Sequence, residues 1–183
     1  SHAKYMSSSQ LLNHQFHQTK QSINSPTLVF IHGLFGDMNN LGVIARAFSD
    51  NYNILRVDLR NHGHSFHSET MNYDVMVDDV WQLIDHLQLD KVILIGHSMG
   101  GKTAMKMTAL QPQRVEKLIV IDIAPVANSS AGHDDVFRGL FAVKKTQPQT
   151  RQQAKPILET EIADLSVVQF MLKSFEPTSS EYF

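Results

Sequence analysis

The stretch VILIGHSMGGK, residues 92–102, places a run of apolar residues directly before a serine flanked by glycines. A short run rich in β-branched residues and without polar alternation is typical of a strand buried on both faces of a parallel sheet. A sharp strand-to-helix turn at Gly96-His97-Ser98-Met99-Gly100 would leave the serine hydroxyl exposed at the end of that strand. The stretch therefore predicts an α/β fold that presents Ser98.

Three further runs share this apolar character, namely TLVFI at Thr27–Ile31, NILRV at Asn53–Val57 and KLIVI at Lys117–Ile121. Together with KVILI at Lys91–Ile95 they predict four strands of a mostly parallel sheet, each buried on both faces. The segment Leu11–His17 is a candidate antiparallel edge strand.

Helical periodicity separates these runs, so that strand and helix alternate. The three predicted apolar faces are Met38, Leu41, Ile44, Ala45 and Phe48; Val77, Val80, Trp81, Ile84 and Leu87; and Gly101, Ala104, Met105, Thr108 and Ala109. This order predicts right-handed crossovers, helices on both faces of the sheet and ligand binding at the carboxyl ends of the strands.

The alternation stops after Ala124-Pro125, and three helices are expected in succession at 134–145, 150–163 and 165–175. Pro156 is expected to kink or shorten the second of them. We therefore divide the chain into a core at 7–127 and a helical cap at 128–183. Phe137, Phe141 and Phe170 of the cap are candidates for lining an acyl pocket, although such residues more commonly pack helix on helix.

Composition points to a soluble globular protein with a small-molecule partner. The 183 residues are 42% hydrophobic, and their sixteen Lys plus Arg and eighteen Asp plus Glu give a net charge of −2. Without a run of either sign, neither nucleic acid nor an anionic membrane is an expected partner. No cysteine occurs, which excludes disulfides and thiolate sites. A cytoplasmic location is expected, because neither a membrane span nor a signal-peptide pattern is found.

The stretch HGLFGD, residues 32–37, follows the first predicted parallel strand. In an α/β fold with a nucleophilic serine, backbone N–H groups of this loop and of the residue after the serine stabilise an oxyanion. These donors would be Leu34 and Met99, with Phe35 as a substitute for Leu34. The alternative is a simple glycine-permitted turn.

A serine needs a base, and the adjacent His97 is not the expected one. Neighbouring side chains in such a turn point apart, so His97 is expected to pack beneath the elbow. His97 and Phe35 are instead candidate substrate contacts. Asp122, at the end of the last predicted strand, can hold a histidine in the required tautomer, or can be only a turn or cap residue.

Three histidines follow the second parallel strand in VDLRNHGHSFH, at positions 62, 64 and 67. Their spacing is that of metal ligands, but Phe66 stands where a metal-binding H-x-H-x-D-H run has its aspartate. A loop that satisfies its own backbone explains them equally well, and we expect no metal. Arg60 and Asn61 are expected to fix this loop beside the site through hydrogen bonds.

The motifs HGLFGDMNNLG, VDLRNHG, GHSMGGK, IDIAPV and FMLKSF occur in this order between Thr27 and Phe175. Together they resemble the α/β-hydrolase superfamily, and within it the YbfF-like esterases, which include mitochondrial α/β-hydrolase domain-containing protein 11. The resemblance implies an esterase of short acyl esters or acyl-thioesters that needs no cofactor. It transfers the nucleophile to Ser98 and the acid to Asp122.

In that family the sheet continues past the cap for two strand-helix units, and the catalytic histidine lies after the last strand. None of the ten histidines of this sequence occupies that place. We therefore expect the C-terminal strands and the histidine loop to be missing from these residues, through truncation or because another chain supplies them. The strand at Lys117–Ile121 is then expected to have an uncovered edge.

A serine esterase is the leading hypothesis. The missing base motivates a non-catalytic acyl-binding or interaction domain as the alternative. Acyl transfer or perhydrolysis on the same fold is a third hypothesis, since fold does not determine the substrate.

Overall fold

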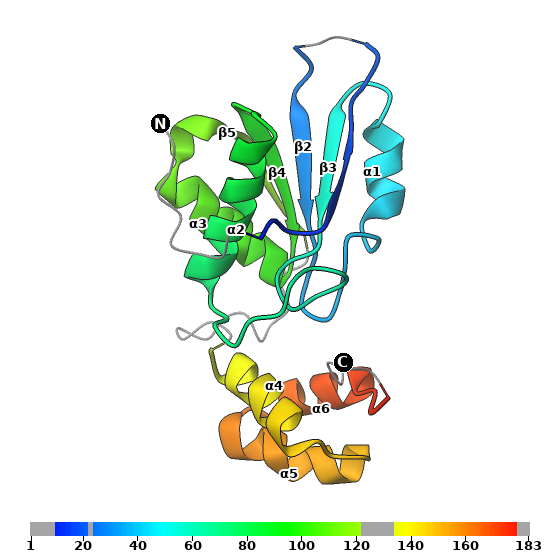
Figure 1. Cartoon of the computed structure of the whole chain (residues 1–183), viewed down its shortest axis with the longest axis vertical. Helices are drawn as coiled ribbons and strands as arrows, with labels where there is room; N and C mark the ends of the chain where they lie inside the picture. The colour runs from blue at the N-terminus through cyan, green and yellow to red at the C-terminus, as the bar shows by residue number, and fades with distance from the viewer. Residues whose placement is uncertain (1–9, 22–23, 122–133, 179–183) are drawn as a thin grey trace. The chain divides into compact units, whose positions relative to one another are not determined.

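A computed structural model of the chain describes residues 10–21, 24–121 and 134–178. The chain divides into two compact units, Ser1–Ile123 and Ala124–Phe183, and each is described by itself. Figure 1 shows the first unit as a sheet with helices and the second as helices.

The first unit is an α/β layer structure. Its elements are β1 (His14–His17), β2 (Thr27–Ile31), α1 (Gly42–Phe48), β3 (Asn53–Val57), α2 (Tyr73–His86), β4 (Val92–His97), α3 (Met99–Leu110), a 3₁₀ turn at Pro112–Arg114 and β5 (Val115–Ile121). The strand order is β1-β3-β2-β4-β5. β2, β3, β4 and β5 are parallel, whereas β1 pairs with β3 antiparallel. The predicted strands, including the edge strand, are confirmed.

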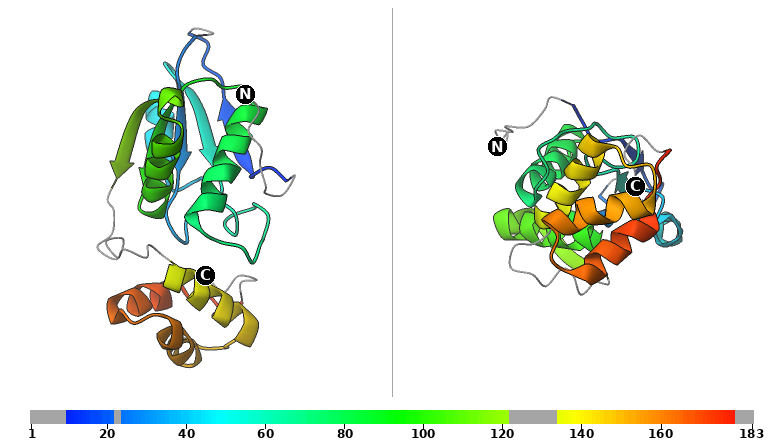
Figure 2. Two further views of the ribbon diagram at one scale, coloured as in Figure 1. Left: turned by 90° about the vertical axis from the view of Figure 1, so that its left-hand side faces the viewer. Right: turned by 90° about the horizontal axis from the view of Figure 1, so that it is seen from below.

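Helices cover both faces of this sheet, as predicted. α1 lies on one face, and α2 and α3 lie on the other (Figures 1 and 2). Because the strands run parallel in register, the loops that follow β2, β3 and β4 all emerge at the carboxyl edge. That edge is where open parallel sheets bind their ligands.

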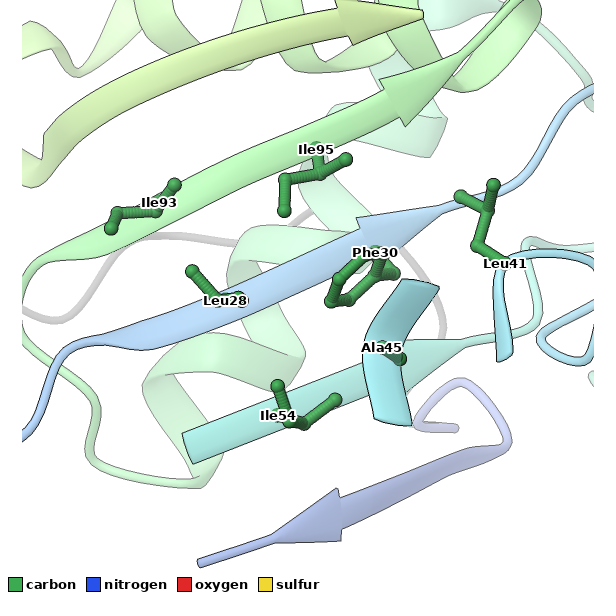
Figure 3. Packing of buried hydrophobic residues seen from close by; sticks show 7 residues of the cluster. All are labelled: Leu28, Phe30, Leu41, Ala45, Ile54, Ile93 and Ile95. Carbon is green, nitrogen blue, oxygen red and sulfur yellow. The ribbon is translucent and has the colours of Figure 1, made fainter. Parts of the chain in front are cut away.

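A cluster of aliphatic and aromatic side chains forms the core between α1 and the sheet (Figure 3). It comprises Leu28, Phe30, Leu41, Ala45, Ile54, Ile93 and Ile95. Side chains alternate along a strand, so Val29, Ile31 and Leu94 lie on the opposite face, where they are fully buried. Burying a large aliphatic side chain is worth about 2 kcal/mol, which explains the nearly unbroken apolar sequence of the central strands.

β5 departs from this expectation. Glu116 and Lys117 are exposed, and Ile119 keeps 46% of its surface exposed. The prediction that this strand is buried on both faces is wrong for the described residues. β5 pairs with β4 on one side only, so it is an edge strand in this sheet.

Two of the predicted helix faces also need correction. α1 begins only at Gly42, and its Ile44 and Phe48 are exposed. In α3, Met105 is 46% exposed, whereas Thr103 and Met107 are buried. The face predicted for α2 is confirmed at Val77, Val80, Trp81 and Ile84. α2 has 14 residues and α1 has 7. A longer helix repeats its apolar pattern over more turns, so its buried face is easier to predict from sequence.

The second unit contains α4 (Asp134–Thr146), α5 (Arg151–Glu161) and α6 (Leu165–Ser174). Its fully buried side chains include Val143, Ala154, Leu158, Val168 and Met171. The Arg151 side chain joins two helices, because its Nε donates to the carbonyl oxygen of Leu172 at 2.8 Å. α5 continues through Pro156 for five residues, so the proline does not end the helix. Within the described residues, no helix of either unit has the length and apolar character needed to cross a membrane.

Candidate active site

Ser98 occupies a strained turn between β4 and α3. Its backbone dihedrals are φ 55° and ψ −116°, in a region that residues with a side chain rarely adopt. The turn is held by backbone hydrogen bonds, since the Ser98 N–H donates to the Ile121 carbonyl at 3.2 Å and the Ser98 carbonyl accepts from Lys102 N–H at 3.1 Å. The residue is half-buried at the carboxyl edge of the sheet. This geometry is that of a nucleophile elbow.

Two glycines permit this turn by close approach. A Cβ atom on Gly96 would collide with the backbone of Gly100, and one on Gly100 would collide with the carbonyl oxygens of Ile31 and His32. α3 therefore begins in direct contact with the end of β2 as well as β4. The glycine spacing read from the sequence has its physical reason here.

The loop after β2 lies beside Ser98. A Cβ built on Gly33 would lie 3.2 Å from Cβ of Ser98 and 3.0 Å from Nδ1 of His97. Leu34 follows Gly33 in this loop, and Met99 is the first residue of α3. N–H groups in the first turn of a helix have no partner within the helix and carry the positive end of its dipole. Leu34 and Met99 thus remain the candidate oxyanion donors.

Phe35 does not qualify as a substitute donor. Its N–H donates to Nε2 of His62 at 3.2 Å and so is already engaged. Phe35 itself has φ 65°, the left-handed region. Its half-buried side chain remains a candidate substrate contact.

The three histidines after β3 differ in burial and in their partners. His62 is buried, and its Nδ1 lies 2.9 Å from the Arg60 carbonyl oxygen while Nε2 accepts from Phe35. His64 and His67 are exposed. In residues 10–21, 24–121 and 134–178, no three His, Cys, Asp or Glu side chains are grouped as metal ligands would be.

A buried ion pair anchors this histidine loop, as expected for Arg60. Its Nε and Nη2 donate to the two carboxylate oxygens of Asp79 at 2.6 and 2.8 Å, and its Nη1 donates to the Thr70 carbonyl at 2.8 Å. Asn61 accepts from Ser68 N–H at 2.8 Å. The first part of the loop is therefore fixed to α2 through Asp79, and to the later part of the loop through Ser68 and Thr70.

Asp58 links three segments, and sequence reasoning assigned it no role. Its carboxylate accepts from Asn13 Nδ2 at 2.8 Å, Met38 N–H at 2.7 Å and His64 N–H at 3.0 Å. Burial acts to raise the pKa of Asp58, but these hydrogen bonds outweigh burial and hold the pKa below its usual value. A charged residue directly after β3 was the available signal.

His32 is a second residue that the sequence did not single out. It is 1% exposed, its Nδ1 lies 2.7 Å from the Gly33 carbonyl oxygen, and its Nε2 accepts from Leu59 N–H at 3.0 Å. Burial and the neighbouring His62 lower the pKa of His32 to about 3. His32 is therefore neutral at neutral pH, and it ties the loop after β2 to the loop after β3.

The remaining candidates differ in how far the structure describes them. Asp122 lies outside the described residues, although the preceding residue, Ile121, pairs with His97 in the sheet. His97 is half-buried, and its Nδ1 would lie 3.0 Å from a Cβ atom built on Gly33. In the second unit Phe137 is buried, Phe141 is half-buried and Phe170 is 47% exposed. Their roles in substrate binding stay predictions.

Known proteins share this architecture. A family model described as the alpha/beta hydrolase fold matches residues 26–165. A Haemophilus influenzae protein named as an esterase/lipase is 69% identical over 183 residues, which are 100% of this chain and 63% of that protein. Escherichia coli esterase YbfF is 48% identical over 155 residues, 85% of this chain and 61% of YbfF.

A solved structure, a marine microorganism esterase, matches with a TM-score of 0.61 and 33% identity, covering 91% of this chain and 64% of that one. The chain thus spans less than two thirds of each of these three proteins. The resemblance to YbfF-like esterases is confirmed by the similarity to YbfF itself. On the family match and the geometry of its strands and elbow, the chain belongs to the α/β-hydrolase fold family.

Proposed function

We propose that Ser98 is the nucleophile of a serine esterase that forms an acyl-enzyme. The single observation that carries this proposal is the backbone of Ser98, held at φ 55° between β4 and α3 beside the glycine of the neighbouring loop. Strain of this kind persists where the surrounding structure imposes it, and it gathers at reactive sites. The names of the esterase relatives support the same reaction class.

In the proposed reaction, the Ser98 oxygen attacks the acyl carbonyl carbon while its proton passes to a histidine base. The carbonyl oxygen becomes an oxyanion, which the N–H groups of Leu34 and Met99 stabilise. The intermediate collapses as the histidine returns the proton to the departing alcohol. Water then attacks the carbonyl carbon of the Ser98 ester while the histidine takes its proton. The histidine gives this proton to the Ser98 oxygen as the carboxylic acid leaves.

The acid and base of the triad are assigned through the family resemblance. Asp122 would hold the histidine and stabilise its protonated form. Support comes from Ile121, whose carbonyl oxygen accepts the Ser98 N–H at 3.2 Å, so the chain reaches the nucleophile one residue before Asp122. The histidine would come from the loop after the family's last strand.

The proposed substrates are short acyl esters, and acyl-thioesters would react by the same chemistry. Phe35 and His97 would contact the substrate near the elbow. Phe137, Phe141 and Phe170 would line an acyl pocket if the helical unit serves as a cap.

A fluorophosphonate probe tests the nucleophile in the full-length protein. Mass mapping is expected to find the label on Ser98, and Ser98→Ala is expected to abolish labelling and p-nitrophenyl butyrate turnover. Ser49→Ala, at the end of α1, serves as a control and should change neither. Undiminished turnover in Ser98→Ala would refute the assignment. Comparing butyrate esters with butyryl thioesters then identifies the leaving group.

A further inference from the structure

The turn that carries Leu34 is held by a side chain from another loop. Phe35 N–H donates to Nε2 of His62 at 3.2 Å, and Nδ1 of His62 lies 2.9 Å from the Arg60 carbonyl oxygen. A carbonyl oxygen only accepts, so Nδ1 carries the proton. Nε2 faces an N–H group and must be without one. These neighbours therefore require the neutral Nδ1–H form of His62.

His32 makes the opposite connection between the same two loops. It belongs to the loop after β2 and accepts Leu59 N–H from the loop after β3, whereas His62 belongs to the loop after β3 and accepts Phe35 N–H. The ring centroids of His32 and His62 lie 5.1 Å apart. Each loop thus uses a neutral histidine to hold a backbone N–H group of the other.

The hydrogen bond from Phe35 N–H to His62 stabilises a backbone conformation of Phe35 that is itself unfavourable. Gly36 N–H donates to the Gly33 carbonyl at 3.0 Å, which closes a turn with Phe35 at its third position. The φ of 65° at that position is typical of a type II turn, which favours glycine there. Flipping the Leu34–Phe35 peptide would relieve Phe35, but it would also turn the Phe35 N–H away from His62. The hydrogen bond therefore selects the observed peptide orientation.

We infer that His62 is a positioning residue for the oxyanion loop, acting through its Nε2 on the Phe35 amide. This role rests on the proposed esterase function, because it concerns where the Leu34 N–H stands relative to Ser98. Gly33, the first residue of the turn, lies against Ser98. A turn that alternates between two peptide orientations holds Leu34 less well, and stabilisation of the transition state depends on donors fixed in advance.

Two substitutions at His62 test separately the hydrogen bond made by Nδ1 and the hydrogen bond made by Nε2. In His62→Asn the amide can still donate to the Arg60 carbonyl but is too short to reach Phe35. In His62→Gln the longer side chain places an acceptor oxygen near the position of Nε2. The exposed His64 of the same loop supplies the control His64→Asn.

Kinetics of the full-length protein on p-nitrophenyl butyrate provide the first test. His62→Asn is expected to lower kcat by about tenfold or more with KM within about threefold, because oxyanion stabilisation acts in the transition state. His62→Gln and His64→Asn are expected to stay within about threefold of wild type. An unchanged kcat in His62→Asn, or an equal loss in His62→Gln, would overturn the inference.

Nuclear magnetic resonance gives a second test that does not depend on activity, and its first measurement uses the wild-type protein and needs no variant. The wild-type His62 ring is expected to carry its proton on Nδ1, and a proton on Nε2 overturns the inference. Hydrogen exchange at the Phe35 amide is expected to accelerate in His62→Asn by about tenfold, while the Ser98 amide is unaffected. If Ser98→Ala retains turnover, the proposed function fails, and these measurements still decide whether His62 holds the turn.

Discussion

The turn after β4 and the turn after β2 meet at the same site, and each places a non-glycine residue at positive φ, 55° for Ser98 and 65° for Phe35. The first is held by main chain, through the Ile121 carbonyl and the close approach of glycines. The second is held by side chains of His62, His32 and Asp58. A turn held by main chain is sensitive to volume, whereas a turn held by side chains is sensitive to protonation and to the anchors of those side chains.

The largest expected effect comes from the anchor beneath the histidine loop. Asp79→Ala leaves the Arg60 side chain, which is 4% exposed, buried without its carboxylate partner. Removing one partner of a buried ion pair costs about 3–5 kcal/mol. Urea unfolding of the variant is expected to show this loss. The control is Asp74→Ala, which removes an exposed ion pair with Lys106 and should cost about 1 kcal/mol or less.

Gly100→Ala is expected to destabilise the turn after β4, which is held by main chain. The new methyl group would collide with the carbonyl oxygens of Ile31 and His32, which belong to the end of β2 and its loop and have little freedom to move. We expect a loss of about 3 kcal/mol in unfolding free energy. Labelling of Ser98 by a fluorophosphonate should fall with it. A variant of wild-type stability would mean that this close contact is absent.

Acidification is expected to weaken the turn held by side chains. The pKa of His32 is lowered from 6.5 to about 3 in the folded protein, so between these values the unfolded chain binds a proton that the folded chain does not. Stability therefore falls as pH decreases through this range, by about 2 kcal/mol between pH 7 and pH 5. Denaturant unfolding at the two pH values measures the change. His32→Asn should reduce this pH dependence, and an equal slope in that variant would assign it elsewhere.

The contrast between the two turns also explains what sequence could predict. The elbow is local, since a buried strand, two glycines and a helix are contiguous in residues 92–102, and its position was predicted correctly. The hydrogen bonds of His62 and Asp58 cross 27 and 20 residues of chain to Phe35 and Met38. Nothing in the local pattern pairs these residues. Their partners follow only from the register that places β2 beside β3.

Burial of β5 was overestimated for a related reason. The apolar run at Lys117–Ile121 describes what a strand is able to pack against, whereas exposure depends on which elements lie beside it. In the described sheet β5 has one neighbouring strand, β4, and Ile119 stays exposed. Composition of a single strand carries no information about its neighbours.

The smallest effect we predict is a difference in stability between two substitutions of Ser98. At an ordinary helix position glycine is about 1 kcal/mol less stable than alanine. At φ 55° and ψ −116° the order should reverse, because glycine lacks the Cβ that makes this conformation costly. Ser98→Gly is therefore expected to have an unfolding free energy about 1 kcal/mol higher than that of Ser98→Ala, as measured by denaturant unfolding. Both variants lack the hydroxyl, so the difference reports backbone strain alone, and the ordinary order would show that the elbow is not strained at Ser98.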